Sequence, residues 1–180
     1  MTEYERYIKM YRKMHRTTDR FPGRSIKKHA DEIGELIRKF DAKTILDYGC
    51  GGGDQYVTHR VQDRWPDVEI FMYDPAVPRF ENKPDGVFDG VVVCDVMEHV
   101  PEEAVDRVLK DIFASAEKFA FFSIRNNPAR VKLPDGTNAH CTLKGHQWWL
   151  KKIRAHSGAV TARVKTRGEV ARTSWQMDDV

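Results

Sequence analysis

Disulfides, structural zinc and membrane spans all require sequence features that this chain lacks. Only three cysteines occur in 180 residues, Cys50, Cys94 and Cys141, and no two of them have CxxC spacing. Their odd number and wide separation argue against a disulfide framework and favour reduced, buried thiols. No apolar run approaches the ~20 residues of a membrane span, and the polar N-terminus lacks a signal peptide's apolar segment. The sequence therefore predicts a cytoplasmic protein without a membrane span.

Internal repeats, low-complexity segments and linkers are also missing, so residues 1–180 are predicted to form a single domain. Charge is unevenly spread. Residues 1–30 carry a balance of +6, residues 31–124 carry −10, and residues 125–180 carry +7. Two basic ends favour an anionic partner, with ordinary solvated surface charge as the simpler alternative.

Apolar periodicity predicts alternating strands and helices. The strands are "KTILDYG", "VEIFMYD", "FDGVVVCDV" and "KFAFFSI", followed by a closing hairpin across Arg167–Gly168. The helices begin near residues 3, 30, 54, 101 and 146, and the third is expected to run through Val57, Val61 and Trp65. This alternation predicts an α/β fold with a doubly wound, mostly parallel sheet and an antiparallel C-terminal hairpin.

The stretch "TILDYGCGGGDQY" places four glycines in five positions at the end of the first predicted strand. Ligands of such sheets sit beyond the carboxyl ends of the strands. A dinucleotide fingerprint would need G-x-G-x-x-G, but Asp54 stands at the third position and would repel a pyrophosphate. The carboxylates of Asp47 and Asp54 instead favour a ligand that carries a cationic amine and a sulfonium. That ligand is S-adenosylmethionine. Asp74, 27 residues further on, can accept hydrogen bonds from both ribose hydroxyls.

Three of these stretches resemble motifs of the class I S-adenosylmethionine-dependent methyltransferases. They are "TILDYGCGGGDQY", "IFMYDP" and "FDGVVVCDVMEHVPEE", and the likeness covers roughly residues 30–175. The resemblance implies a Rossmann-like methyltransferase sheet of seven strands with a reversed last strand. Only 14 residues separate Asp74 from Asp89, too few for the usual helix and edge strand, so the third-strand region is predicted to be trimmed.

The resemblance also implies a cofactor site. Asp47 and Gly49 would lie near the methionine part, Cys50, Gly51 and Gly53 would belong to the cofactor loop, Asp74 would hold the ribose, and Tyr73 and Pro75 would flank the adenosine. The residue that contacts adenine is left open between Asp85 and Asp95.

Acidic groups and histidines gather after the third strand. His99 is the first choice as general base, with Glu98 orienting it and His140 closing the site. The set also resembles metal-assisted O-methyltransferases, which would make Asp95, Glu98, His99 and His140 ligands of a divalent ion. The alternative is a metal-free site in which Glu98 bonds backbone amides. Because the motif of base N-methyltransferases is missing at "CDVMEH", exocyclic base methylation is disfavoured.

The predicted function is O-methylation of a small or phosphorylated acceptor. Residues 1–30 would form a helical substrate cover over a cofactor-binding core of residues 31–180, and cations at the pocket mouth would bind an anionic acceptor. The site residues predicted for this role are Arg24, Arg125, Arg130 and Lys144. Three alternatives remain open: a nucleic-acid or nucleotide methyltransferase, a non-catalytic cofactor-binding subunit, and an NAD-binding reductase, which Asp54 disfavours.

Overall fold

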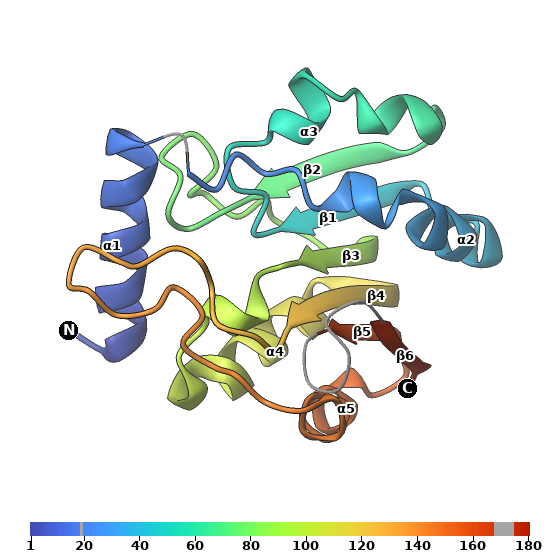
Figure 1. The fold of residues 1–180 in the computed structure, drawn as a ribbon. Coiled ribbons are helices and arrows are strands. Elements are labelled where there is room, and N and C mark those ends of the chain that lie inside the picture. Colours follow the sequence, from blue (N-terminus) through green and yellow to red (C-terminus); the bar gives the residue numbers. More distant parts are fainter. Residues whose placement is uncertain (19, 168–174) are drawn as a thin grey trace.

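A computed structural model describes residues 1–18, 20–167 and 175–180. One sheet carries the fold, with strand order β2-β1-β3-β4-β5-β6. All neighbouring pairs are parallel except β5 and β6 (Figure 1). The strands are β1 (Thr44–Tyr48), β2 (Glu69–Tyr73), β3 (Phe88–Cys94), β4 (Ala116–Arg125), β5 (Thr161–Arg167) and β6 (Trp175–Asp179).

Helices cover both faces of the sheet because its central strands are apolar on both sides. Val91 and Val93 of β3 pack with α4 and α5, whereas Val92 and Cys94 pack with α2. This two-residue alternation is what a strand buried on both faces produces. The α-helices are α1 (Glu3–Thr17), α2 (Ala30–Phe40), α3 (Asp54–Val57), α4 (Val105–Ala114) and α5 (His146–Ser157). Short 3₁₀ turns are η1 (Ile26–Lys28), η2 (Val61–Arg64), η3 (Met97–His99) and η4 (Glu102–Ala104).

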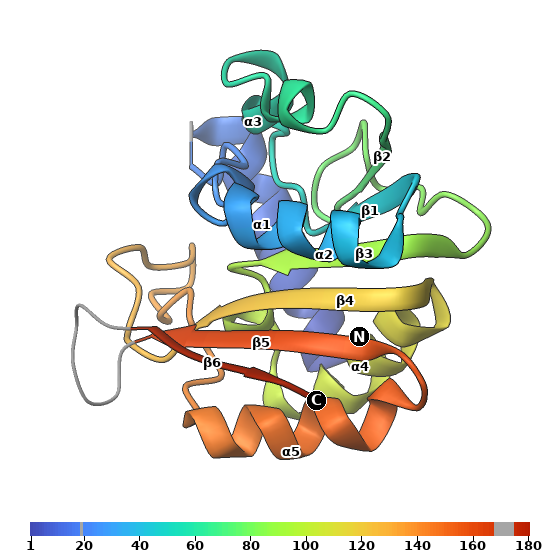
Figure 2. The same cartoon turned by 90° about the vertical axis from the view of Figure 1, so that its right-hand side faces the viewer.

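The predicted doubly wound sheet is confirmed, including the trimmed third-strand region. Residues 74–87, between β2 and β3, contain no strand, so the sheet has six strands rather than seven within the described residues. The antiparallel end is also present, with β6 beside β5 at the outer edge (Figure 2). The predicted turn at Arg167–Gly168 extends outside the described residues.

One predicted helix is wrong. The stretch through Val57, Val61 and Trp65 forms the short α3 and the separate turn η2 instead of one helix. Arg60 between them has a φ of 45°, in the left-handed region, which a right-handed helix cannot pass through. Val57 consequently points outward and is 75% exposed.

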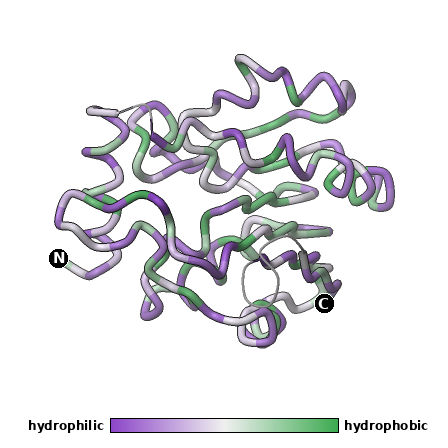
Figure 3. The backbone as a smooth tube through the Cα atoms, in the orientation of Figure 1, coloured by the Kyte–Doolittle hydropathy of each residue, from purple (hydrophilic) through white to green (hydrophobic). Residues whose placement is uncertain are grey.

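The first helix lies apart from the layers, across the carboxyl ends of the strands (Figure 1). Hydrophobic colour runs mainly along the strands, whereas much of α1 is hydrophilic (Figure 3). The buried face of α1 consists of Tyr7, Tyr11 and Met14, which pack with Leu133 and Ala139 from the long loop between β4 and α5. In the described chain, no helix is both long and apolar enough to cross a membrane.

Candidate active site

The glycine loop after β1 is tied to the end of β2. The backbone N–H groups of Gly49 and Cys50 donate to the carbonyl oxygen of Tyr73, at 2.7 and 3.1 Å. Gly49 has a φ of +85°, and a Cβ there would lie 2.4 Å from a methyl carbon of Val96. Only glycine suits that backbone and that contact. The loop therefore brings the ends of β1, β2 and β3 together around one space.

A strap formed by residues 21–23 closes the other side of the glycine loop. The carbonyl oxygens of the strap accept hydrogen bonds from the N–H groups of Gly52, Asp54 and Gln55, at 3.0, 2.8 and 2.8 Å. These amides surround the start of α3, where a phosphate would otherwise bind. With them occupied, the geometry agrees with the argument against a dinucleotide.

The strap was not identified as part of the site from the sequence. Gly23 has a φ of +76°, and a Cβ there would lie 2.0 Å from the carbonyl oxygen of Cys50. A Pro-Gly pair between two helices was the available signal. The need for glycine at position 23 depends on a loop 27 residues further along the chain, so the neighbouring residues in the sequence do not indicate it.

Two carboxylates line the space that the loop encloses. Asp74 accepts hydrogen bonds from the N–H groups of Gly51 and Ala76, both at 2.9 Å. Asp47 is 2% exposed and accepts from Gln55 Nε2 at 2.7 Å and from the Tyr56 hydroxyl at 2.9 Å. Burial raises the pKa of Asp47 to about 7 and also raises the pKa of Asp74. A cation beside these groups would stabilise their charged forms.

A cavity of about 990 Å³ extends from these aspartates to the histidines after β3. Most of the sequence-predicted site residues line it: Asp47, Gly49, Cys50, Gly51, Asp74, Pro75, Asp95, His99, His140, Arg24, Arg125 and Arg130. Five predicted residues are not in the lining: Gly53, Tyr73, Asp85, Glu98 and Lys144. Gly53 instead precedes α3, and the Tyr73 ring packs against Tyr48 at 5.0 Å between centroids.

His99 is held by two oxygens at one ring nitrogen. Its Nδ1 lies 3.0 Å from the carbonyl oxygen of Ala139 and 3.0 Å from the hydroxyl of Tyr11. A carbonyl oxygen only accepts, so Nδ1 carries the proton and Nε2 keeps its lone pair. Burial, with His140 as the next cause, lowers the pKa of His99 to about 4. Near neutral pH the ring is therefore an uncharged base.

His140 stands against His99, with ring centroids 4.8 Å apart and planes at 84°. Its Nδ1 lies 2.6 Å from the carbonyl oxygen of Asn127, which assigns its proton to Nδ1 by the same reasoning. Burial lowers the pKa of His140 as well. Both histidines thus leave Nε2 without the proton, and each is anchored by the loop between β4 and α5.

Glu98 is the most buried acid of the site, at 0% exposure. Its Oε1 accepts from the backbone N–H of Arg125 at 3.2 Å, whereas Oε2 is buried without a hydrogen-bond partner among the described residues. Burial and the nearby Asp95 raise the pKa of Glu98 well above its usual value. A buried carboxylate oxygen without a donor is costly unless the group is protonated or faces a cation.

Glu98, His99 and His140 form a candidate metal site, with one potential ligand atom from each lying within 4.8 Å of the others. Asp95, the fourth predicted ligand, is not in this group. Its carboxylate bonds Ser25 at 2.9 Å, Ser123 at 3.3 Å and Arg125 at 3.1 Å. Burial would raise the pKa of Asp95, but Arg125 and Ser25 outweigh burial and hold that pKa below its usual value.

The predicted substrate cations differ in how much of their charge is available. Arg24 pairs with Asp54, and Lys144 pairs with Glu102 at 2.7 Å, outside the cavity lining. Arg125 pairs with Asp95. Arg130 lines the cavity, is exposed, and has no ion-pair partner among the residues that the structure describes. Of the four, Arg130 is the one whose charge is not already matched.

The parallel sheet, the glycine loop with its two aspartates and the covered cavity together define a class I S-adenosylmethionine-dependent methyltransferase. The chain belongs to the methyltransferase-domain family, whose sequence profile matches residues 7–163. It is therefore an enzyme whose methyl donor is S-adenosylmethionine.

Solved structures agree on the fold. The chain is similar to the Burkholderia thailandensis 1,6-didemethyltoxoflavin-N1-methyltransferase, solved with 1,6-didemethyltoxoflavin and S-adenosylhomocysteine, at 15% identity and a TM-score of 0.62. That match covers 99% of this chain and 90% of the other. It is also similar to an O-methyltransferase family protein from Burkholderia thailandensis, at 14% identity and a TM-score of 0.54, covering 86% of this chain and 55% of the other. No curated protein matches the chain.

Proposed function

We propose that this enzyme methylates an acidic oxygen on a small acceptor, with Nε2 of His99 as the general base. The observation that carries the proposal is the pair of oxygens at Nδ1 of His99, which leaves Nε2 as the free nitrogen of a cavity-lining ring. The acceptor oxygen attacks the methyl carbon as the carbon–sulfur bond breaks, and its proton passes to Nε2. S-adenosylhomocysteine leaves as the neutral thioether.

The low basicity of His99 favours acceptors whose hydroxyl is already acidic. A phenol or enol, with a pKa near 10 for tyrosine-type hydroxyls, needs much less help from a weak base than an alkyl alcohol. The unpaired Arg130 gives an acidic substituent of the acceptor one available cation at the cavity wall. We accordingly place small, anionic phenols and enols first among candidate acceptors, ahead of the nucleic-acid acceptor that the sequence left open.

The cofactor is proposed to lie between the glycine loop and the end of β2. Asp74 would hold the ribose, Asp47 would face the cationic methionine part, and the bare backbone of Gly49 and Gly51 would lie against the ligand. Residues 1–30 are proposed to cover the acceptor, since α1 lies across the strand ends and lines the cavity. Orientation inside such a closed site can supply ~7–11 kcal/mol of the barrier.

A divalent ion at Glu98, His99 and His140 is a second proposal for the same site. The unpartnered Oε2 of Glu98 and two imidazoles whose Nδ1 is bound to a carbonyl oxygen fit such an ion. When bound, it would lower the pKa of the acceptor hydroxyl. Titration calorimetry with Mn²⁺ or Zn²⁺ tests this directly. Binding that Glu98→Gln removes supports the ion, and wild-type protein without affinity rules it out.

The function itself is tested with labelled S-adenosylmethionine and a panel of small phenols and enols. Each phenol is paired with the aromatic amine that carries nitrogen in place of the hydroxyl oxygen. We expect labelled methyl on oxygen, identified by mass spectrometry, and loss of turnover in His99→Gln. The matched control is His156→Gln, because His156 bonds Asp106 on the surface away from the cavity. Methylation of the amines alone would refute the oxygen assignment, and wild-type rates in His99→Gln would refute the base.

A further inference from the structure

Tyr11 of α1 connects three segments that are far apart in the sequence. Its side chain is buried, and its hydroxyl donates to the carbonyl oxygen of Ala139 at 2.6 Å while lying 3.0 Å from Nδ1 of His99. Its ring meets those of His99 and Phe21 edge-on, at 5.4 and 5.5 Å between centroids. One residue of the cover therefore contacts the proposed base, the strap and the loop that also anchors His140.

The hydrogen-bond directions in this cluster follow from counting protons. A phenol has one proton and keeps it throughout the neutral range. The carbonyl oxygen of Ala139 can only accept. Because the Tyr11 hydroxyl lies 2.6 Å from that oxygen, the hydroxyl donates its proton there. The phenol oxygen can then only accept from His99. The proton of His99 at Nδ1 is thus shared between two fixed oxygens.

We propose that Tyr11 is a positioning residue for methyl transfer, which orients the His99 ring only when α1 covers the cavity. The inference rests on the proposed function, because it assumes that His99 is the base. If this holds, the helix that covers the cavity also supplies one of the two oxygens that orient the His99 ring. An enzyme with α1 displaced would keep its glycine loop and aspartates but lose one of the two oxygens that hold His99.

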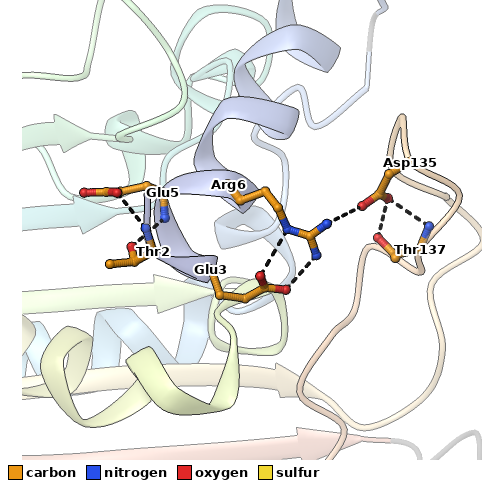
Figure 4. A network of polar contacts seen from close by, with 6 residues as sticks. All are labelled: Thr2, Glu3, Glu5, Arg6, Asp135 and Thr137. Carbon is orange, nitrogen blue, oxygen red and sulfur yellow. Dashed lines mark hydrogen bonds and ion pairs between the residues drawn. The ribbon is translucent and has the colours of Figure 1, made fainter.

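Contacts on either side of Tyr11 seat α1 independently of the hydroxyl. Toward the N-terminus, Arg6 donates to Asp135 of the β4–α5 loop at 3.0 Å, and Asp135 also accepts from the Thr137 hydroxyl at 2.6 Å (Figure 4). Toward the other end, Arg12 donates to the carbonyl oxygen of Pro75 at 2.8 Å and pairs with Glu81. Since these contacts and the buried face of α1 do not depend on the Tyr11 hydroxyl, removing that hydroxyl should leave the helix in place.

The test compares Tyr11→Phe with Met14→Leu. Met14 belongs to the buried face of α1 and is not in the cavity lining, so its substitution perturbs helix packing without touching His99. We expect Tyr11→Phe to lower kcat by about tenfold or more, with the acceptor KM and the affinity for S-adenosylhomocysteine changed by less than about twofold. Met14→Leu should leave kcat within about twofold of wild type.

Long-range ¹H–¹⁵N spectra of the imidazoles give a second readout that needs no acceptor, with the His99 signals assigned by their loss in His99→Gln. Wild-type His99 should carry its proton on Nδ1, and Tyr11→Phe should shift the Nδ1 signal, because the N–H group then has only the carbonyl oxygen of Ala139 as its acceptor. Equal kcat in Tyr11→Phe and Met14→Leu would overturn the proposal, as would an Nε2-protonated His99 in the wild type. Should the acceptor panel give no product, the proposed function fails, while the spectra still decide whether Tyr11 holds His99.

Discussion

The carboxylate of Asp74 accepts a hydrogen bond from the backbone N–H of Gly51 at 2.9 Å, which joins the end of β2 to the glycine loop of β1. Its other oxygen accepts from the N–H of Ala76 at the same distance. Asp74 is thus both part of the loop's framework and a wall of the cavity. A ligand that binds here meets a carboxylate whose orientation is already determined.

Replacing Asp74 should weaken cofactor binding, and it also removes the acceptor that joins the end of β2 to the glycine loop. We expect Asp74→Ala to weaken S-adenosylhomocysteine binding by about 2–3 kcal/mol, the usual loss for a charged hydrogen-bond partner, and Asp74→Asn to be intermediate. Titration calorimetry measures both. Asp67→Asn, an exposed carboxylate change elsewhere, serves as the control. Unchanged affinity in Asp74→Ala would remove Asp74 from the cofactor site.

Asp47 should make cofactor binding depend on pH. Its pKa is raised to about 7 by burial, partly opposed by the Tyr56 hydroxyl, with a smaller raising effect from Asp74 and a smaller lowering effect from Gln55. A protonated Asp47 cannot attract a cationic ligand, so S-adenosylmethionine affinity should fall as the pH drops from about 8 to about 6. Calorimetry across that range measures the effect. An affinity that rises or stays flat would contradict this role.

The same raised pKa predicts a trend in the stability of the ligand-free protein. The neutral form of Asp47 is favoured in the folded state, so its contribution is fully present below pH 3.8 and is lost as the pH rises through about 7. The loss is roughly 4 kcal/mol at most. Asp47→Asn should reduce this loss, seen in urea unfolding at about pH 5 and about pH 8. Asp63→Asn, a change in a surface pair with Arg60, should leave the slope as in wild type.

Gly23→Ala should disrupt the strap. A Cβ would lie 2.0 Å from the carbonyl oxygen of Cys50, so the strap would have to leave the glycine loop. Gly136→Ala is the matched control, because Gly136 has a similar φ of +88° and a Cβ added there would meet nothing within 4 Å. We expect the Gly23 variant to unfold at a clearly lower urea concentration than the Gly136 variant. Equal midpoints would show that the strap adds nothing to stability.

The ion pair between Arg6 and Asp135 should contribute little to global stability. Its side chains are 39% and 30% exposed, and solvent and salt screen such surface pairs strongly. Arg6→Ala should therefore leave the unfolding free energy close to that of wild type. Chemical denaturation measures the change. A much larger loss would mean that α1 depends on this pair rather than on its buried face.

Much of the fold was predictable because its signals are local. The apolar runs of β1, β3 and β4 and the helical stripe of α4 each depend on residues within a few positions. The missing strand between β2 and β3 followed from counting residues. The continuous helix after the glycine loop failed because the left-handed backbone of Arg60 has no clear signature in its side chain.

The site was predictable only in part. Asp47, Asp74 and the glycines stand at the ends of strands, and His99 and His140 lie beside each other as their placement after neighbouring strands suggested. Lys144 pairs with Glu102 and does not line the cavity. The carboxylate of Asp95 pairs with Arg125 and accepts hydrogen bonds from two serines. Whether a charge is free depends on its neighbours in space, which the order of residues does not give.

The sequence by itself determined the class of sheet, the place of the glycine loop and the two aspartates that line the cavity beside it, since these follow from periodicity and from short motifs. Tertiary structure decided which groups surround the proposed base. Tyr11 reaches His99 across 88 positions and Ala139 across 128. The physical reason is that hydrogen-bond partners are selected by the packing of α1 against a distant loop, and no local pattern encodes that pairing.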